Sequence, residues 1–266
     1  MAITTMISAL GAPGASTTVA ALTTAWPGPV LAVDADPVRG SLVPGWLSRW
    51  WVDGRITTET GVVTFAASTR RMTSVPAEGL ASHTAQVPNA RHIRVLPGVL
   101  HAEQAIAIGS EGWARLASAL RDLTNAGPDV LVDAGRWCPH TPWPLLNVAD
   151  RVLLAVRPSL RSCSGSADLA RYLFDRFEHV QLAVLAADSP GAADTARALD
   201  LPRGLALPDD ASSARVFADG ATEPFGLARR PLWKATRRTA RALHAQAHSP
   251  IRGTRGLDST QAGVAE

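Results

Sequence analysis

The sequence predicts an α/β protein, a single three-layer domain in which a mostly parallel central sheet is flanked by helices. Short apolar or β-branched runs alternate with helix-length segments, which is typical of strands joined by crossover helices. Two of these runs, 130–132 and 152–156, are apolar without interruption and predict central strands covered on both faces. The predicted strands are 3–9, 30–34, 92–96, 130–133, 152–156, 180–185 and 204–207.

The same alternation predicts the connecting helices and one domain over residues 1–248. The segment 41–89, rich in Trp, Thr and Gly, predicts short helices without a fixed register. Residues 249–266 contain Pro250, three glycines and few apolar residues, which predicts a disordered tail. The predicted helices are 16–25, 111–125, 164–177, 192–200, 211–219 and 229–247.

Composition excludes several classes of protein. With 266 residues, 46% of them hydrophobic and 18% charged, the chain can bury a sizeable core. No run approaches the roughly eighteen apolar residues of a membrane span, and the N-terminus lacks the basic lead of a signal peptide, so a cytoplasmic protein is expected. Cys138 and Cys163 are expected to be reduced thiols. The seven histidines show no spacing that predicts a metal site or a nucleophilic triad.

Positive charge is concentrated at the C-terminus. Residues 229–266 carry eight Arg or Lys against two acidic residues, a net +6, whereas residues 1–228 carry 18 basic and 21 acidic residues, a net −3. Residues 1–233 contain no lysine. An anionic partner is therefore expected to meet the C-terminal segment.

A candidate phosphate-binding loop, ALGAPGASTT at residues 9–18, lies between the first predicted strand and the first predicted helix. Glycines let a backbone approach a phosphate closely, and the N-terminus of a helix directs free N–H groups and a positive dipole toward it. Against the template G-x-x-x-x-G-K-[ST], Gly14 and Ser16 match, while Ala9 replaces the first glycine and Ala15 the lysine. The motif is therefore incomplete.

Two other interpretations of this loop stay open. It can be an ordinary strand-to-helix turn in which Ser16 caps the helix. It can also be a dinucleotide-binding turn, because Asp34 ends the second strand about twenty residues after Gly14, where a ribose-binding acid is expected. Against this, Pro13 occupies the middle glycine of G-x-G-x-x-G, and its ring does not allow that backbone geometry.

Acidic residues close further strands in a definite order. Asp34 and Asp36 come at the end of the strand in LAVDADP (31–37), and Asp133 comes at the end of the strand in VLVDAG (130–135). Two further segments of this kind come later in the chain, ADRVLLAVRP (149–158) and LALPDD (205–210). In this order and spacing, roughly residues 1–225 resemble the ParA/MinD family of deviant P-loop ATPases, the SIMIBI class. The resemblance implies a P-loop NTPase-like fold and ATP or ADP with Mg²⁺ as ligands.

The resemblance also implies a role for each site residue. Ser16 would hold Mg²⁺, Asp133 would hold a magnesium-bound water, and Asp36 would orient the water that attacks the γ-phosphate. Such hard oxygen ligands suit Mg²⁺. For the acids the alternative is a structural role at strand ends, where Asp34 and Asp36 cap the turn at Pro37. The implied nucleotide-binding residues are Gly11, Ala12, Pro13, Gly14, Ala15, Ser16, Thr17 and Asp34.

The family's loop KGGVGKTT contains two lysines, which fall here on Leu10 and Ala15. Without a cation on the β- and γ-phosphates the transition state of phosphoryl transfer loses several kcal/mol of stabilisation, so efficient ATP hydrolysis is not expected. This loss is similar to that in TadZ/CpaE-like proteins, which implies a positioning or scaffold component of pilus-assembly, secretion or conjugation machinery that binds nucleotide weakly. The alternative is a slow ATPase in plasmid or chromosome partitioning that binds DNA through its basic C-terminal segment.

Two segments are candidates for partner contacts. Trp46, Trp50 and Trp51 follow the Asp36 loop, where related proteins contact a partner subunit, so a homodimer or another protein partner is expected there. The alternative is that Trp46 and Trp50 are buried on one face of a short helix. Residues 229–255 can give weak contact with DNA or an anionic membrane, and with it a peripheral location at membrane or nucleoid. The alternative is a last helix packed on the sheet with a solvated arginine face.

Overall fold

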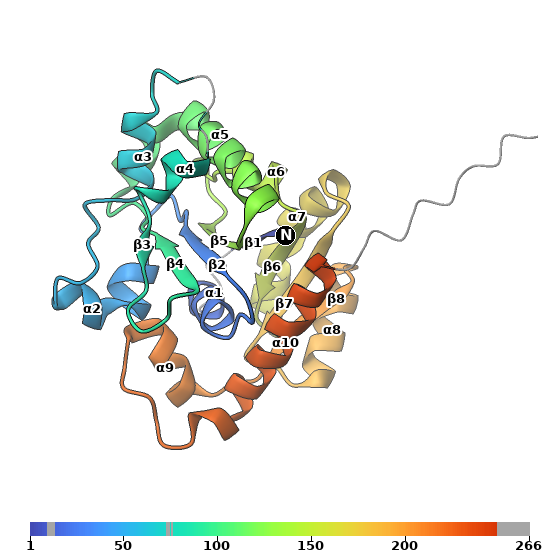
Figure 1. Ribbon diagram of the computed structural model, residues 1–266. Coiled ribbons are helices and arrows are strands. Elements are labelled where there is room, and N and C mark those ends of the chain that lie inside the picture. Colours follow the sequence, from blue (N-terminus) through green and yellow to red (C-terminus); the bar gives the residue numbers. More distant parts are fainter. Residues whose placement is uncertain (10–13, 73–74, 76, 249–266) are drawn as a thin grey trace, which may run out of the picture.

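The computed structural model describes residues 1–9, 14–72, 75 and 77–248. They form an eight-stranded sheet between two layers of helices, with the strand order β3-β4-β2-β5-β1-β6-β7-β8 (Figure 1). All neighbouring strands are parallel except β3 and β4, so the predicted fold class is confirmed. The strands are β1 (Ile3–Ser8), β2 (Val30–Asp34), β3 (Ala85–Gln86), β4 (Ile93–Leu96), β5 (Asp129–Arg136), β6 (Arg151–Val156), β7 (Val180–Leu185) and β8 (Arg203–Leu207).

The handedness of the crossovers assigns the helices to the two layers. From β1 through α1 to β2, the chain steps along the sheet toward β3. The connections through α5, α7 and α8 each step in the opposite direction, toward β8. Because parallel crossovers are right-handed, α1 covers one face and the other three helices cover the opposite face. The helices are α1 (Ala15–Thr24), α2 (Ser48–Val52), α3 (Val62–Ser68), α4 (Ala77–Ala81), α5 (Ala102–Ala126), α6 (Trp143–Asn147), α7 (Leu160–Arg176), α8 (Ser189–Leu199), α9 (Ala211–Asp219) and α10 (Pro231–His248), with a π-helix η1 (Leu42–Trp46) and a 3-10 turn η2 (Leu227–Arg229).

Apolar side chains fill both spaces between sheet and helices. On the α1 face, Leu22 packs in one cluster with Trp46, Phe217 and Leu243, which come from η1, α9 and α10. On the other face, clusters centred on α5 and α7 cover the two halves of the sheet. Each fully buried large aliphatic side chain contributes roughly 2 kcal/mol to folding. The core therefore holds the strand ends, and the loops that follow them, in fixed positions.

Two features differ from the sequence predictions, and a third prediction falls outside the described residues. Helix α5 begins at Ala102, nine residues earlier than expected, because Gly109 with φ 63° joins two helical pieces across a kink. The two-residue edge strand β3 pairs antiparallel with β4 in the segment for which only short helices were predicted. The predicted tail, 249–266, lies outside the described residues.

Helix α10 is packed on α1 and β8 through its apolar face, as the structural alternative predicts. Because these side chains are part of the core, they are not available to a bilayer, and any anionic surface would meet the exposed cations instead. Among the described helices none has the length and apolarity needed to cross a membrane. The buried face comprises Leu232, Ala235, Thr236, Ala240 and Leu243, and the exposed cations include Lys234, Arg237, Arg238 and Arg241.

An ion pair joins the start of α10 to the start of α9. Arg230 Nη2 lies 2.7 Å from Asp210 Oδ1, and Arg230 Nε lies 3.2 Å from Asp210 Oδ2. The Asp210 side chain is 4% exposed and also accepts a hydrogen bond from the Ser213 hydroxyl. The Arg230 guanidinium holds the pKa of Asp210 well below its usual range. The contribution of this pair to stability is therefore present above the ordinary aspartate pKa and is lost as the pH falls through the lowered one.

Arg230→Met is expected to lower the thermal unfolding midpoint at pH 7 by a few degrees, because it leaves the Asp210 carboxylate buried without its cation. The measurement is thermal unfolding followed by circular dichroism. Arg237→Met, on the exposed face of the same helix, is the matched control and should leave the midpoint nearly unchanged. Equal midpoints for the two variants would contradict the assignment.

Candidate nucleotide site

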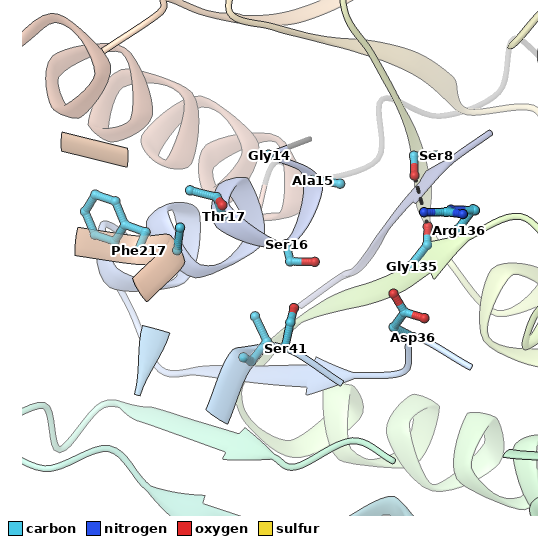
Figure 2. Close-up of a pocket in the computed structure, with 12 residues that line it drawn as sticks. Ser8, Gly14, Ala15, Ser16, Thr17, Asp36, Ser41, Gly135, Arg136 and Phe217 are labelled. Atoms are coloured by element: carbon cyan, nitrogen blue, oxygen red, sulfur yellow. Dashed lines mark hydrogen bonds between the residues drawn. The ribbon is translucent and has the colours of Figure 1, made fainter. Parts of the chain in front are cut away.

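A cavity of about 270 Å³ opens at the carboxyl ends of β1, β2 and β5, above the N-terminus of α1 (Figure 2). Crossovers leave this edge toward both faces of the sheet, which is where open α/β sheets place ligands. The volume is at the low end for small-molecule sites. The lining residues are Ser8, Gly14, Ala15, Ser16, Thr17, Asp36, Ser41, Leu42, Gly135, Arg136, Phe217 and Ala218.

The N-terminus of α1 supplies one wall. Gly14 is the N-cap, with φ 113°, and it makes no side-chain capping hydrogen bond. The prediction that Ser16 caps the helix is therefore wrong: a left-handed glycine ends the loop, and Ser16 lies within the first turn, on the cavity. The positive end of the helix dipole meets the cavity here, which favours an anion. Gly11, Ala12 and Pro13 of the predicted loop lie outside the described residues.

Two carboxylates lie side by side behind this cavity. Asp34 of β2 and Asp133 of β5 are register partners, and both are buried. Asp34 Oδ2 accepts a hydrogen bond from the Leu42 N–H at 2.8 Å, and Asp133 Oδ1 accepts one from the Gly135 N–H at 3.0 Å. Among the described residues, Asp34 Oδ1 and Asp133 Oδ2 have no hydrogen-bond partner. Each carboxylate therefore keeps one buried oxygen that can take a proton or a cation.

The pair is shifted toward its protonated forms. Burial, reinforced by the Asp133 carboxylate, raises the pKa of Asp34 to about 8. Burial also raises the pKa of Asp133, to about 6, although the Ser16 hydroxyl acts in the opposite direction. Like charges this close and this poorly solvated cannot both ionise at low cost. At neutral pH the site therefore holds a proton that a divalent cation can displace.

Glycines make room for the Asp34 carboxyl. A Cβ at Gly98 would lie 2.7 Å from Asp34 Cγ and 2.9 Å from the Asp34 carbonyl oxygen. A Cβ at Gly40 would lie 2.8 Å from Asp34 Oδ2. Asp34 is 1% exposed and is not among the described residues that line the cavity, which counts against the dinucleotide interpretation. Its place among the nucleotide-binding residues stays a prediction.

Asp36 both stabilises a turn and lines the cavity. Its Oδ1 accepts hydrogen bonds from the N–H groups of Val38 (2.8 Å) and Arg39 (3.4 Å), so it caps the turn after Pro37. Its side chain also lines the cavity (Figure 2), and a Cβ at Gly135 would overlap its carboxyl group. Burial raises the pKa of Asp36, and the Arg136 guanidinium is among the groups that act against this rise.

The described lining of the cavity carries little positive charge. Of the described lining residues, Arg136 is the only cation, and Ala15 occupies the position predicted for the phosphate-binding lysine. Ser16 and Thr17 line the cavity. Asp36 follows β2 and Asp133 lies in the neighbouring strand β5, so the two acids belong to adjacent strands as predicted. Ser8, Ser41 and Phe217 also line the cavity and were not predicted from the sequence. They come from three distant segments, and no local motif marks them.

Aromatic residues flank the site. Phe217 of α9 forms part of the cavity wall and stacks on Trp233 of α10, with ring centroids 5.5 Å apart and an interplanar angle of 14°. Trp46, the last residue of η1, lies in the core, and Trp50 of α2 packs partly against it, so the two residues are buried or partly buried but belong to different helical segments rather than to one short helix. Trp51 is 39% exposed, so it is the member of the tryptophan segment that a partner can reach.

Comparison with known proteins establishes the fold. No family model matches this sequence, and no curated protein is significantly similar to it. Solved structures are similar in three dimensions over almost the whole chain. A ParA family ATPase from Chlorobium tepidum has a TM-score of 0.70 at 17% identity, covering 91% of this chain and 98% of its own.

Two MinD structures give the same picture. The septum site-determining protein MinD from Pyrococcus horikoshii, complexed with Mg-ADP, has a TM-score of 0.71 at 16% identity, covering 93% of this chain and 97% of its own. The MinC:MinD cell division complex from Aquifex aeolicus has a TM-score of 0.70 at 18% identity, covering 96% and 99%. The chain has the P-loop NTPase fold of the ParA and MinD ATPases.

Proposed function

We propose that this protein is a positioning or scaffold component of pilus-assembly, secretion or conjugation machinery, and that its nucleotide site binds ATP or ADP with Mg²⁺ weakly and supports little or no hydrolysis. The observation that carries this proposal is the cation-poor cavity. Ala15 lines the wall at the N-terminus of α1, and among the described lining residues Arg136 alone is positively charged. A helix dipole alone gives modest attraction for an anion.

The remaining donors fit Mg²⁺. Asp133 Oδ2 is buried and has no partner among the described residues, and the Ser16 hydroxyl influences the same carboxylate from the start of α1. Mg²⁺ takes oxygen ligands and keeps most of its waters. Ser16 would hold the ion directly and Asp133 would hold it through a water, and Asp36, which lines the cavity, would orient the attacking water. Bound there, Mg²⁺ would neutralise phosphate charge that no lysine neutralises.

The positioning part of the proposal draws on the fold and the surface. One structure with this fold is a septum site-determining protein, and another is a complex between MinD and MinC. On this chain, Trp51 is exposed beside a buried aromatic core, on the segment that follows the Asp36 loop. A protein partner of the secretion, pilus or partition class is proposed to dock there, because exposed tryptophan is common where interfaces are strongest.

Restoring the missing cation tests the site. Ala15→Lys is expected to tighten MgATP binding by tenfold or more, because a charge-assisted hydrogen bond to a phosphate contributes about 1.5–3 kcal/mol. Ala15→Met has a similar length without the charge and should bind MgATP no better than the unmodified protein. The measurement is isothermal titration calorimetry with a non-hydrolysable ATP analogue. Equal affinity for the Lys and Met variants would contradict the view that a missing cation weakens the site.

The rate of phosphate release from ATP decides between scaffold and ATPase. The unmodified chain is expected to release phosphate from ATP at the background rate. The alternative function, a slow partitioning ATPase that holds DNA, is favoured by Asp36 in the cavity and by the exposed cations of α10. Turnover that Asp36→Ala abolishes, together with DNA binding that weakens steeply with salt, would establish that alternative and overturn the scaffold proposal.

A further inference from the structure

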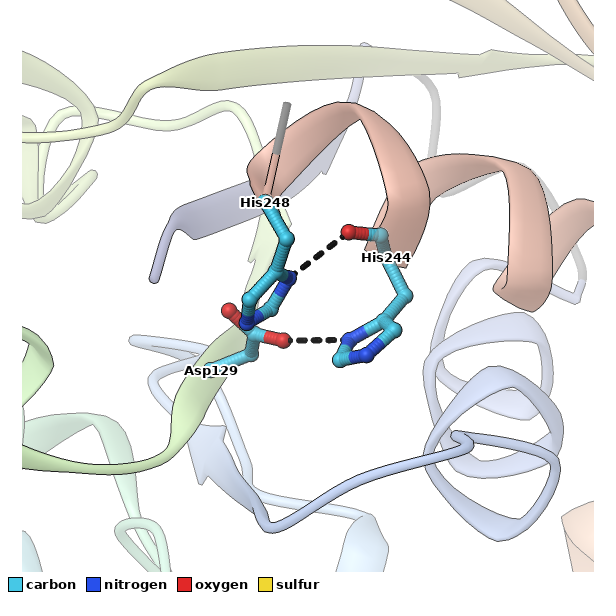
Figure 3. A group of neighbouring side chains, drawn as sticks. All are labelled: Asp129, His244 and His248. Atoms are coloured by element: carbon cyan, nitrogen blue, oxygen red, sulfur yellow. Dashed lines mark hydrogen bonds and ion pairs between the residues drawn. The ribbon is translucent and has the colours of Figure 1, made fainter. Parts of the chain in front are cut away.

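Figure 3 shows a second cluster of side chains with metal-ligating chemistry. It lies where β5 begins, whereas the cavity lies where this strand ends. Asp129 begins β5, and His244 and His248 stand one turn apart on the last turns of α10. Each offers one ligand atom, and these three atoms all lie within 4.8 Å of one another. The histidine pattern did not predict this cluster. The i, i+4 spacing of the two histidines was visible in the sequence, but the carboxylate is 115 residues away from His244.

The hydrogen bonds leave His248 Nε2 for a metal. His244 Nδ1 is hydrogen-bonded to Asp129, and a metal bound between them would take the place of the shared hydrogen. His248 Nδ1 lies 2.8 Å from the His244 carbonyl oxygen, and because a carbonyl can only accept, Nδ1 carries the hydrogen. The neutral His248 ring therefore has its lone pair on Nε2. His244 Nδ1 lies 2.8 Å from Asp129 Oδ2, and the centroids of the two imidazole rings are 4.1 Å apart.

Surrounding groups hold two of the three ligands in place. The Asp129 carboxylate is buried, where Oδ1 accepts a hydrogen bond from the Ala2 N–H (2.8 Å) and Oδ2 accepts one from Trp26 Nε1 (3.0 Å). The Trp26 ring also meets the His244 ring edge-on, with centroids 5.8 Å apart. A Cβ at Gly28 would lie 3.1 Å from His244 Cε1, so glycine leaves just enough room for the imidazole. Supporting contacts of this kind are typical around metal ligands.

We propose that Asp129, His244 and His248 form a site for a divalent transition metal of the zinc class, with water completing the coordination. Two imidazoles and one carboxylate are a ligand set that Zn²⁺ accepts with an open fourth position. Two nitrogens on a tetrahedral Zn²⁺ are about 3.3 Å apart, so the side chains need to close by only about 1.5 Å from their widest separation. The exposed His248 can make this adjustment by rotating its side chain, which loosens its hydrogen bond to the His244 carbonyl oxygen.

A metal bound at this site would cross-link the C-terminal helix to the sheet. It joins the end of α10 to the first residue of β5 and, through Asp129, to the backbone of Ala2. Metal binding would fix the last described turn of α10 against the sheet, far from the nucleotide cavity. It would therefore raise the stability of the folded chain in proportion to metal concentration, without altering nucleotide binding.

The test uses tag-free, full-length protein titrated with Zn²⁺ by calorimetry, and with Co²⁺ as a spectroscopic substitute. The unmodified chain is expected to bind one equivalent of Zn²⁺ with micromolar affinity or better, and Zn²⁺ is expected to raise its thermal midpoint. His248→Ala should weaken the affinity at least tenfold and abolish the rise, since it removes one of three ligands. His179→Ala, an exposed histidine on the loop before β7, is the matched control and should change neither quantity.

Asp129→Asn gives a second, independent variant. It keeps an oxygen that can accept hydrogen bonds from Ala2 or Trp26 but removes the charge that the metal requires, so it should also weaken Zn²⁺ binding while the chain stays folded. The proposal is overturned if the unmodified chain takes up no stoichiometric Zn²⁺, or if His248→Ala and His179→Ala bind it as well as the unmodified chain. In either case the cluster is a hydrogen-bonded anchor for α10 and nothing more.

Discussion

Asp34→Asn is expected to stabilise the folded protein by several kcal/mol at pH 8 and to have little effect at pH 4. Burial and the Asp133 carboxylate raise the pKa of Asp34 to about 8 in the folded chain, whereas an unfolded aspartate titrates near 4. Between these values the folded state binds more protons than the unfolded state, so the free energy of unfolding falls as the pH rises. Asparagine cannot ionise, which removes this loss. Its amide oxygen can still accept the hydrogen bond from the Leu42 N–H.

The measurement is urea denaturation from pH 4 to pH 8 without Mg²⁺ or nucleotide. The unmodified chain should lose stability across this window, and the Asp34→Asn variant should follow a flatter curve. Asp122→Asn, at an exposed position on α5, is the control and should track the unmodified chain. Parallel curves for Asp34→Asn and the unmodified chain would show that Asp34 is ionised at no cost and that the carboxylate pair is not strained.

Gly98→Ala is expected to cost about 3 kcal/mol or more. Its new methyl group would lie 2.7 Å from Asp34 Cγ, 2.8 Å from Asp34 Oδ1 and 2.9 Å from the Asp34 carbonyl oxygen. The carbonyl belongs to the end of β2 and cannot move without disturbing the sheet. Overpacking of a closed site of this kind typically costs 1–3 kcal/mol, and a backbone contact places it at the upper end.

Gly79→Ala is a suitable control, because it lies within α4 and, among the described residues, its methyl group would meet only the Val75 side chain, at 3.2 Å. That side chain can shift, and alanine favours a helix by about 0.5–1 kcal/mol over glycine, so little net change is expected. The measurement is the free energy of unfolding in guanidinium chloride at pH 7. If the two alanine variants have equal stability, the pocket around Asp34 is wider than the structure indicates.

Much of this molecule was predictable because parallel strands have simple rules. Asp36 follows β2 and Asp133 lies in the second half of β5, and the carboxyl ends of parallel strands share one edge of the sheet, so their approach was a consequence of the strand pattern. Gly14 was harder, because its role as N-cap depends on a φ of 113°, which the side-chain pattern does not encode. Phe217 and Asp129 were out of reach for a different reason. Their partners come from segments that only tertiary packing brings together.

The stack between Phe217 and Trp233 joins two surfaces that would otherwise be independent. Phe217 is a wall of the cavity, and Trp233 stands in the first turns of the helix that carries the exposed arginines. A molecule that enters the cavity and displaces the Phe217 ring would also have to displace the Trp233 indole that stacks on it. Trp233 thus links the wall of the cavity to the helix that an anionic partner would contact.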